Sequence, residues 1–197
     1  MRYRSPSWAA VAHPVPKPHA PEGFRLTFDY SRTNDYFYPV ANNVPNMENL
    51  THDVSGSQIF ADIDFRHAFW QIPLHENSQE FLAFSTPAGT FAPTRVPQGH
   101  QDASSYFQAV TYPLFEKIRA QVLQYLDDFL LHAKDEAHLI SVISEFLDIC
   151  LKYNLKIGAE KTNLFLREAR FSGKIISADG IRFDPRNLKT LQSTRLD

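Results

Sequence analysis

The chain has 197 residues, and its hydrophobic content of 43%, with 16 Phe and 8 Tyr, argues against a disordered protein. A single cysteine, Cys150, rules out an intrachain disulfide, and its place in a helical apolar pattern predicts a small core residue. No apolar stretch reaches the roughly 18 residues that cross a membrane. Residues 1–6 contain no hydrophobic signal segment, so we expect neither a membrane segment nor secretion.

The net charge of −2 hides an uneven distribution along the chain. Residues 1–151 carry 10 Lys/Arg and 17 Asp/Glu, a balance of −7, whereas residues 152–197 carry 10 and 5, a balance of +5. An acidic body followed by a basic segment suits a polyanion whose phosphates are bridged by cations. An ordinary solvated charged surface would give the same counts, so charge alone does not decide between the two.

The predicted elements of the N-terminal half are mostly short strands. Five prolines within residues 1–22 predict an extended, loop-like lead-in, followed by a strand at 24–30 and turns over 31–48. Residues 58–65 predict a second strand, and residues 81–91 a hairpin that turns at Pro87-Ala88-Gly89. Alternation in the second strand puts Ala61, Ile63 and Phe65 on one face and Phe60, Asp62 and Asp64 on the other.

Helical spacing dominates the C-terminal half. Residues 104–118 predict a helix that kinks or ends early at Pro113. Residues 135–151 predict the clearest helix, with one apolar face made of Leu139, Ile140, Ile143, Phe146, Leu147 and Cys150. Two further strands are predicted at 170–176 and 181–183, joined through Ala178-Asp179-Gly180. This order of elements predicts an α+β fold, with helices packed behind an antiparallel sheet.

The most informative local pattern is Tyr125-Leu126-Asp127-Asp128, which sets two adjacent carboxylates inside the apolar run 122–131. The pattern predicts a β-hairpin whose tight turn carries the Asp pair, with strands at 122–123 and 129–131. Two ionised carboxylates in apolar surroundings repel each other and lose hydration, and a divalent cation such as Mg²⁺ removes both penalties. The alternative is a plain turn, because Asp is a common turn residue.

A third carboxylate, Asp64, ends the predicted strand at 58–65. A β-hairpin beside that strand would bring Asp64, Asp127 and Asp128 together at one sheet edge. Three carboxylates of this kind hold two Mg²⁺ ions roughly 3.5–4 Å apart in enzymes of phosphoryl transfer. One ion would lower the pKa of an attacking 3′-hydroxyl, and the other would neutralise a leaving pyrophosphate.

From about residue 6 to residue 191 the chain resembles the reverse transcriptase of gypsy-type LTR retrotransposons. Several ordered blocks carry the resemblance: Asp64 to Ile72, with an aromatic five residues after the Asp; Val96-Pro97-Gln98-Gly99 continuing to Phe107-Gln108; Tyr125 to Asp128; Leu155-Lys156 with Lys161; and Phe171 to Ile176 with Asp179-Gly180-Ile181. Upstream, Arg25 stands four residues before Asp29-Tyr30, as the fingers arginine of the family does.

The resemblance implies the palm of a right-hand polymerase, an antiparallel sheet backed by helices, with fingers and without a thumb. The implied domains are fingers at 1–52, a palm strand with the first catalytic Asp at 53–74, a fingers hairpin at 75–97, palm at 98–183, and the start of a connection to a missing thumb at 184–197. Thumb, RNase H and integrase are then expected downstream in a longer polyprotein, located inside the cell in a cytoplasmic particle.

The family's catalytic roles map onto residues of this chain. Asp64, Asp127 and Asp128 would be the catalytic metal ligands for two Mg²⁺ ions, or Mn²⁺, with Asp128 the less direct ligand. The spacing to the aromatic favours Asp64 over Asp62, which would be a solvated or supporting residue. The primer and template would be contacted by Tyr125, Gly173 and Lys174.

The implied nucleotide site draws on other segments. Arg25 suits a bidentate grip on a triphosphate, and Phe69 would lie under the sugar and exclude a 2′-hydroxyl. Gln98 offers hydrogen bonds to the nucleotide, and Gly99 permits close approach. Lys17 would be a second phosphate contact or an exposed surface lysine. Lys161 would protonate the departing pyrophosphate or be plain surface.

Some positions depart from the family pattern. Ser104 stands where a Pro is usual, Gln98 where many gypsy-type elements have Phe, Ser31 where Arg is usual, and Lys174 where His or an aromatic is commoner. None of these changes removes a metal ligand, so they bear on rate and template handling more than on reaction type.

The implied function is an RNA-directed DNA polymerase that uses dNTPs on a primed RNA or DNA template. One competing function is a truncated, inactive retroelement remnant that folds and binds nucleic acid through its basic tail, and the missing thumb favours it. Another is an RNA-dependent RNA polymerase, whose palm shares the Asp geometry. Phe69 argues against the RNA polymerase, because such an enzyme must admit the 2′-hydroxyl.

Overall fold

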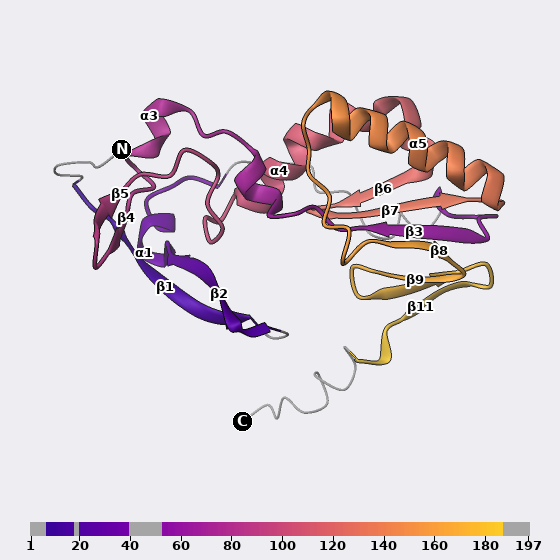
Figure 1. Cartoon of the computed structure of the whole chain (residues 1–197), viewed down its shortest axis with the longest axis horizontal. Helices are drawn as coiled ribbons and strands as arrows, with labels where there is room; N and C mark the ends of the chain where they lie inside the picture. The colour runs from indigo at the N-terminus through magenta and orange to yellow at the C-terminus, as the bar shows by residue number, and fades with distance from the viewer. Residues whose placement is uncertain (1–6, 18–19, 40–52, 187–197) are drawn as a thin grey trace. The chain divides into compact units, whose positions relative to one another are not determined.

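The computed structural model describes residues 7–17, 20–39 and 53–186. The chain divides into two compact units, drawn in Figure 1: the first comprises Met1–Asn42 and His67–Phe107, and the second Asn43–Arg66 and Gln108–Asp197. No helix in the described ranges is long and apolar enough to cross a membrane. The assignment of these units to fingers and palm stays a prediction.

The first unit is built on a four-stranded sheet of order β2-β1-β4-β5. Its strands are β1 (Ala10–Lys17), β2 (Ala20–Asp29), β4 (Phe84–Thr86) and β5 (Gly89–Phe91), and its short helices are α1 (Ser31–Asn34), η1 (Ala68–Gln71) and α3 (Glu76–Gln79). The predicted β4–β5 hairpin and the strand at 24–30 are confirmed. Ala10, Phe28, Tyr30 and Leu82 form its core, and the Tyr30 hydroxyl donates a 2.7 Å hydrogen bond to the Leu82 carbonyl.

The extended, loop-like lead-in predicted at residues 1–22 is wrong at residues 10–17, because Ala10–Lys17 forms strand β1 in spite of its prolines; residues 1–6 and 18–19 of this prediction lie outside the described residues. Pro14 and Pro16 are two residues apart, so both direct their missing N–H toward the same edge of the strand. β1 pairs with β4 only at Ala10 and Val11, before the prolines begin, and with β2 along its whole length. Proline is therefore tolerated here, because one edge of this part of β1 needs no ladder bonds.

The second unit is an antiparallel sheet of order β6-β7-β3-β8 with a layer on each face (Figure 1). The four strands are β3 (Ile59–Ile63), β6 (Val122–Tyr125), β7 (Asp128–Ala133) and β8 (Asn163–Leu166). One face is covered by α5 (Glu136–Lys152), and the other by a three-stranded sheet of β9 (Glu168–Phe171), β10 (Lys174–Ser177) and β11 (Gly180–Phe183). The α+β class with helix behind antiparallel sheet is confirmed.

Apolar packing on both faces explains why this sheet is buried. On the α5 side the rings of Phe65, Phe115, Phe129 and Phe146 contact one another, with centroids 4.5–6.1 Å apart. On the other side the sheet presents Phe60, Leu123 and Leu130 to Ala169, Phe171 and Ile176. Both faces of β3 are thus buried. An alternating sequence pattern by itself would predict one buried face and one exposed face.

The helical predictions need one correction. The helix predicted at 104–118 is α4 (Ala103–Thr111), which ends before Pro113 and continues as the 3₁₀ segment η2 (Tyr112–Gln121), as the predicted kink requires. On α5, however, Ile140 and Leu147 are 56% and 47% exposed, and the buried face also includes Val142. The predicted buried face wrongly included Ile140 and Leu147. Helical periodicity identifies an apolar side of the helix, but it does not show which residues on that side contact the sheet.

The strand predicted at 170–176 is wrong, because this segment folds back on itself as a hairpin. β9 ends at Phe171 and β10 begins at Lys174, and these two residues pair across the turn. The turn residues Ser172 and Gly173 have φ values of 45° and 79°. Two consecutive left-handed residues make the tight turn that matches the twist of a hairpin.

Candidate active site

The Tyr125–Asp128 segment forms the predicted hairpin. β6 and β7 are joined by the two-residue turn Leu126-Asp127, and Tyr125 pairs with Asp128 at its base. Leu126 has φ = 57°, a left-handed conformation that non-glycine residues rarely adopt. Such a conformation persists only where the surrounding structure holds it, and strained residues of this kind gather at functional sites.

Two buried glutamines hold this turn. Oε1 of Gln108, on α4, accepts a 2.7 Å hydrogen bond from the backbone N–H of Leu126. Nε2 of Gln124 donates to the Leu126 carbonyl at 3.1 Å and to Oγ1 of Thr111 at 2.6 Å. Gln108 belongs to the nucleotide-site block of the sequence, and the sequence patterns did not predict that either glutamine supports the turn. The available signal was an amide inside the apolar run 122–131, because a buried amide requires hydrogen-bond partners.

Strand register brings Asp64 to the hairpin. In the β3–β7 ladder the last pair is Ile63 with Phe129, so Asp64 directly follows β3 at the end of the sheet where Asp128 begins β7, and continuation of the same register would set the two opposite each other. Directly opposite residues of an antiparallel pair project from the same face. Asp62 lies two residues before Asp64 and shares that face, which is the face that Phe60 and Leu130 present to β9 and β10.

The carboxylates affect one another's ionisation. Asp128 still reaches solvent, yet partial burial and the charges of Asp127, Asp62 and Asp64 raise the pKa of its carboxyl to about 6. Burial, with a further contribution from Asp64, also raises the pKa of Asp127 and of Asp62. Uncompensated negative charge is therefore concentrated at this end of the sheet.

Asp64 is held against the turn that precedes β8. The Gly158 N–H donates a 2.8 Å hydrogen bond to the Asp64 carbonyl, and a Cβ at Gly158 would lie 2.9 Å from Oδ1 of Asp64. Position 158 therefore requires glycine if Asp64 is to keep this place. Nζ of Lys161 lies 3.5 Å from Oδ2 of Asp64, so the structure places this predicted residue beside the carboxylates.

The described residues contain no group of three or more His, Cys, Asp or Glu already arranged as a metal site. The donor set nevertheless fits a hard divalent cation, because carboxylate oxygens are the ligands that Mg²⁺ and Mn²⁺ prefer. The raised pKa values of Asp127 and Asp128 show the electrostatic cost that a bound cation would remove.

The predicted nucleotide residues of the first unit lie on three of its segments: the β1–β2 ribbon, η1 and the Gln98-Gly99 turn. Gly99 has φ = 107°, and a Cβ there would lie 2.7 Å from the Phe28 carbonyl oxygen, so only glycine fits. Nδ2 of Asn34 donates to the Gly99 carbonyl at 3.2 Å, which ties the Gln98-Gly99 turn to α1. Arg25, opposite Val15 in the β1–β2 ribbon, and Lys17 are both exposed.

Phe69, the predicted sugar-contacting residue, lies in η1 and is half-buried. Its ring packs edge-on against Phe107, with centroids 5.9 Å apart. The contact fixes the orientation of the ring, and part of the ring still reaches solvent. Phe69 is therefore both a packing residue and an available surface.

The predicted primer residues belong to the second unit. Tyr125 is half-buried and packs against the cluster that includes Leu123, Leu130 and Phe171. Gly173 and Lys174 lie at the β9–β10 turn, where Lys174 pairs with Phe171 and Phe183. The roles of all three residues stay predictions.

Comparison with known proteins identifies the family. Residues 15–183 match the family model described as "Reverse transcriptase (RNA-dependent DNA polymerase)", so the chain belongs to the reverse transcriptase family of nucleotidyltransferases. It is 31% identical over 196 residues to the Retrovirus-related Pol polyprotein from transposon 297, and 28% identical over 191 residues to the one from transposon gypsy, both of Drosophila melanogaster. The predicted relation to gypsy-type elements is confirmed.

The matched relatives are much longer proteins. The two alignments cover 97% and 96% of this chain but only 18% of each relative. The fold is similar to a foamy viral protease-reverse transcriptase in complex with double-stranded DNA, with a TM-score of 0.84 and 21% identity over 98% of this chain and 34% of that one. A foamy viral protease-reverse transcriptase with an RNA/DNA hybrid gives a TM-score of 0.79 and 21% identity over 96% and 25%.

Proposed function

We propose that this chain is the fingers and palm of an RNA-directed DNA polymerase that transfers deoxynucleotides to a primer 3′-hydroxyl with the help of two divalent cations. The observation that carries the proposal is the strand register that brings Asp64 to the end of the sheet where Asp128 begins β7, beside the turn that carries Asp127. Family membership supports nucleotidyl transfer, and the carboxylates supply the cation ligands that such chemistry requires.

In this proposal Asp64 and Asp127 are the principal cation ligands, and Asp128 is the less direct one. Bound Mg²⁺ would activate the 3′-hydroxyl and neutralise the pyrophosphate. The chain's own contribution is to fix the ligands: Gln108 and Gln124 hold the Asp127 turn, and the Gly158 turn holds Asp64. Lys161, 3.5 Å from Asp64, balances part of the negative charge and would protonate the departing pyrophosphate.

The first unit would bind the incoming nucleotide. Arg25 would contact the triphosphate, with Lys17 as a second contact, because a guanidinium can bind two phosphate oxygens at once. Gln98 and Gly99 would contact the nucleotide at the turn that the hydrogen bond from Asn34 of α1 to the Gly99 carbonyl holds in place. Phe69 would exclude the 2′-hydroxyl and so select dNTPs.

Cation binding tests the site directly. Calorimetric titration of the chain with Mn²⁺ should show binding that the Asp64→Asn/Asp127→Asn double variant loses, because both main ligands are then neutral. Asp148→Asn serves as the matched control, since Asp148 is an exposed carboxylate of α5 that contributes to none of the pKa shifts of Asp62, Asp127 and Asp128. Equal binding by the wild type and the double variant would contradict the proposal.

Primer extension separates an enzyme from a remnant. The chain joined to its natural downstream sequence should extend a primed RNA or DNA template with dNTPs and Mg²⁺. The 197-residue chain alone should bind weakly and extend poorly, because affinity for nucleic acid is spread over many phosphate contacts. A longer protein that binds primed template without extending it would favour the inactive remnant.

A further inference from the structure

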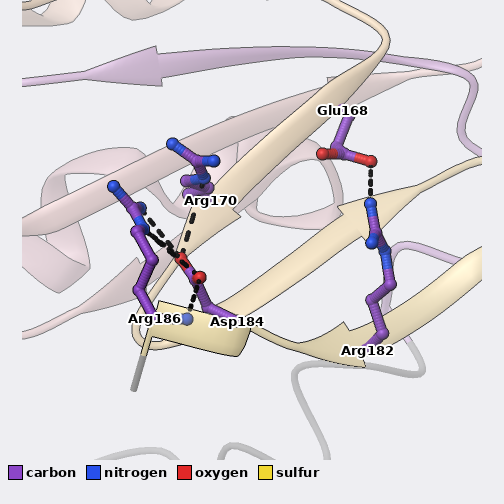
Figure 2. A network of polar contacts seen from close by, with 5 residues as sticks. All are labelled: Glu168, Arg170, Arg182, Asp184 and Arg186. Atoms are coloured by element: carbon purple, nitrogen blue, oxygen red, sulfur yellow. Dashed lines mark hydrogen bonds and ion pairs between the residues drawn. The ribbon is translucent and has the colours of Figure 1, made fainter. Parts of the chain in front are cut away.

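A buried carboxylate lies outside the candidate active site, directly after β11. Asp184 is only 4% exposed, and two arginines surround it (Figure 2). Its Oδ2 lies 2.8 Å from Nη2 of Arg186 and 3.6 Å from Nε of Arg170. Its Oδ1 accepts a 3.0 Å hydrogen bond from the Arg186 backbone N–H. The side chain thus joins β9 to the segment that follows β11.

The backbone of the same residue reaches the β9–β10 turn. The Asp184 N–H donates a 3.1 Å hydrogen bond to the carbonyl of Gly173. Gly173 and Ser172 are the two left-handed residues of that turn, and Lys174 follows at the start of β10. Residue 184 therefore supports the turn from the side of β11.

The Asp184 carboxylate is held in its ionised form. Hydrogen bonds from Arg186, with a further contribution from Arg170, lower the pKa of Asp184 to about 2. A buried anion with two cationic partners has a narrow range of acceptable positions, because any displacement leaves charge unpaired. The backbone N–H of Asp184 is held separately, by its bond to the Gly173 carbonyl.

We propose that Asp184 is a positioning residue for the Ser172-Gly173-Lys174 turn, and that it fixes this turn for contact with the primer end. The inference rests on the proposed function, in which Gly173 and Lys174 contact the primer. Arg170 and Arg186 hold the Asp184 side chain, the Asp184 N–H holds the Gly173 carbonyl, and Gly173 directly precedes the start of β10. A small displacement of a positioning group can lower productive binding by an order of magnitude or more.

The same sheet offers a matched control. Glu168 of β9 and Arg182 of β11 form a second ion pair, also drawn in Figure 2. Glu168 pairs with Ser177 at the end of β9 away from the Ser172-Gly173 turn. Glu168→Gln therefore removes a surface ion pair from this sheet without changing a contact of the turn.

The test compares binding of two labelled nucleic acids to the full chain by fluorescence anisotropy. One probe is a DNA template with a recessed primer 3′ end, and the other is the same template unprimed. Asp184→Asn should lower the preference for the primed probe by about tenfold and leave the affinity for the unprimed probe unchanged. Glu168→Gln should keep the wild-type preference.

Arg186→Gln should lower the preference for the primed probe as well. The Arg186 side chain is 65% exposed, so this variant is expected to fold, and it replaces Asp184→Asn in the test if that variant does not fold. A variant with the wild-type preference, or with equal losses on both probes, would overturn the positioning role. A wild type that does not distinguish the probes would instead contradict the proposed primer contact, and with it the premise of this role.

Discussion

The backbone N–H of Leu126 donates a 2.7 Å hydrogen bond to Oε1 of Gln108, a side chain from α4, the helix that precedes the Tyr125–Asp128 hairpin in the chain. Leu126 is left-handed, so this bond and the one from Gln124 to its carbonyl hold a conformation that the residue itself does not favour. The position of Asp127 thus depends on two uncharged amide side chains, Gln108 and Gln124.

The first prediction follows from that support. Gln108→Leu should lower the free energy of unfolding by about 1–3 kcal/mol, because it leaves the Leu126 N–H without its partner. It should also weaken Mn²⁺ binding, since Asp127 then moves with its turn. Chemical denaturation and calorimetry measure the two effects. Gln121→Leu, outside this network, is the control, and unchanged Mn²⁺ affinity in Gln108→Leu would show that the turn is held by β6 and β7 alone.

A second prediction concerns the requirement for glycine beside Asp64. In Gly158→Ala the new Cβ would lie 2.9 Å from Oδ1 of Asp64, so the carboxylate must move. We expect Mn²⁺ affinity to fall by about tenfold or more, because groups that orient a metal ligand typically contribute that much. Ala159→Ser, at the exposed neighbouring position, should bind as the wild type does. Wild-type affinity in Gly158→Ala would mean that Asp64 is not a principal ligand.

The hairpin with its Asp pair was predictable because the signal is local: an apolar run, a turn and two carboxylates within a few residues. Strand β1 was not predictable, because proline is rare in strands that pair on both edges. The part of β1 that contains Pro14 and Pro16 pairs with β2 only, so proline is tolerated there. The approach of Asp64 to the Asp127-Asp128 hairpin was expected from a hairpin lying beside the strand that Asp64 ends, but the sequence does not give the register, because it depends on pairing between residues more than sixty positions apart.

The supports of the site were less visible in the sequence. Gln108 and Gln124 become informative only when both are known to be buried beside Leu126. Asp184 follows β11, whose sequence carries no sign of a buried carboxylate. Its partner Arg186 is two residues away, but Arg170 comes from another strand, so the sequence does not show that the three residues meet. Contacts of this kind depend on the three-dimensional packing, which a pattern of residue types does not encode by itself.

The third prediction is a pH dependence that arises in the core of the second unit. His132 is 3% exposed, its Nδ1 lies 2.8 Å from Oγ of Ser57, and its Nε2 has no hydrogen-bond partner among the described residues. Burial lowers the pKa of His132 to about 4, below the value of 6.5 for a free histidine. The unfolded chain therefore binds more protons between these values, so this histidine makes the fold less stable as pH falls.

Chemical denaturation at pH 7 and pH 5 measures this effect. His132 should reduce the free energy of unfolding by about 2 kcal/mol over that interval, and His132→Gln should lack this contribution. The carboxyl of Asp128, with its raised pKa, acts in the opposite direction, so the quantity to compare is the difference between wild type and variant. His75→Gln, at an exposed position of the first unit, is the control for a histidine substitution as such. Identical slopes for the wild type and His132→Gln would refute the assignment.

The last prediction concerns sugar selection by Phe69. If its exposed edge excludes the 2′-hydroxyl, Phe69→Val should raise the incorporation of ribonucleotides relative to deoxynucleotides, by roughly 10- to 100-fold for rejection of a single hydroxyl. Competition between rNTP and dNTP in primer extension measures the ratio, with the chain joined to its natural downstream sequence. Phe81→Val is the matched control, because Phe81 belongs to the same unit and is 53% exposed.

Phe69 also packs on Phe107, so its truncation should lower stability as well, and thermal unfolding of the variant must accompany the assay. A change in the incorporation ratio cannot come from lost stability alone, because both nucleotides are added by the same surviving fraction of folded protein. A stable variant with an altered ratio would support the sugar contact. A less stable variant with the wild-type ratio would reduce Phe69 to a packing residue of the first unit, and dNTP selection would then have to be assigned elsewhere.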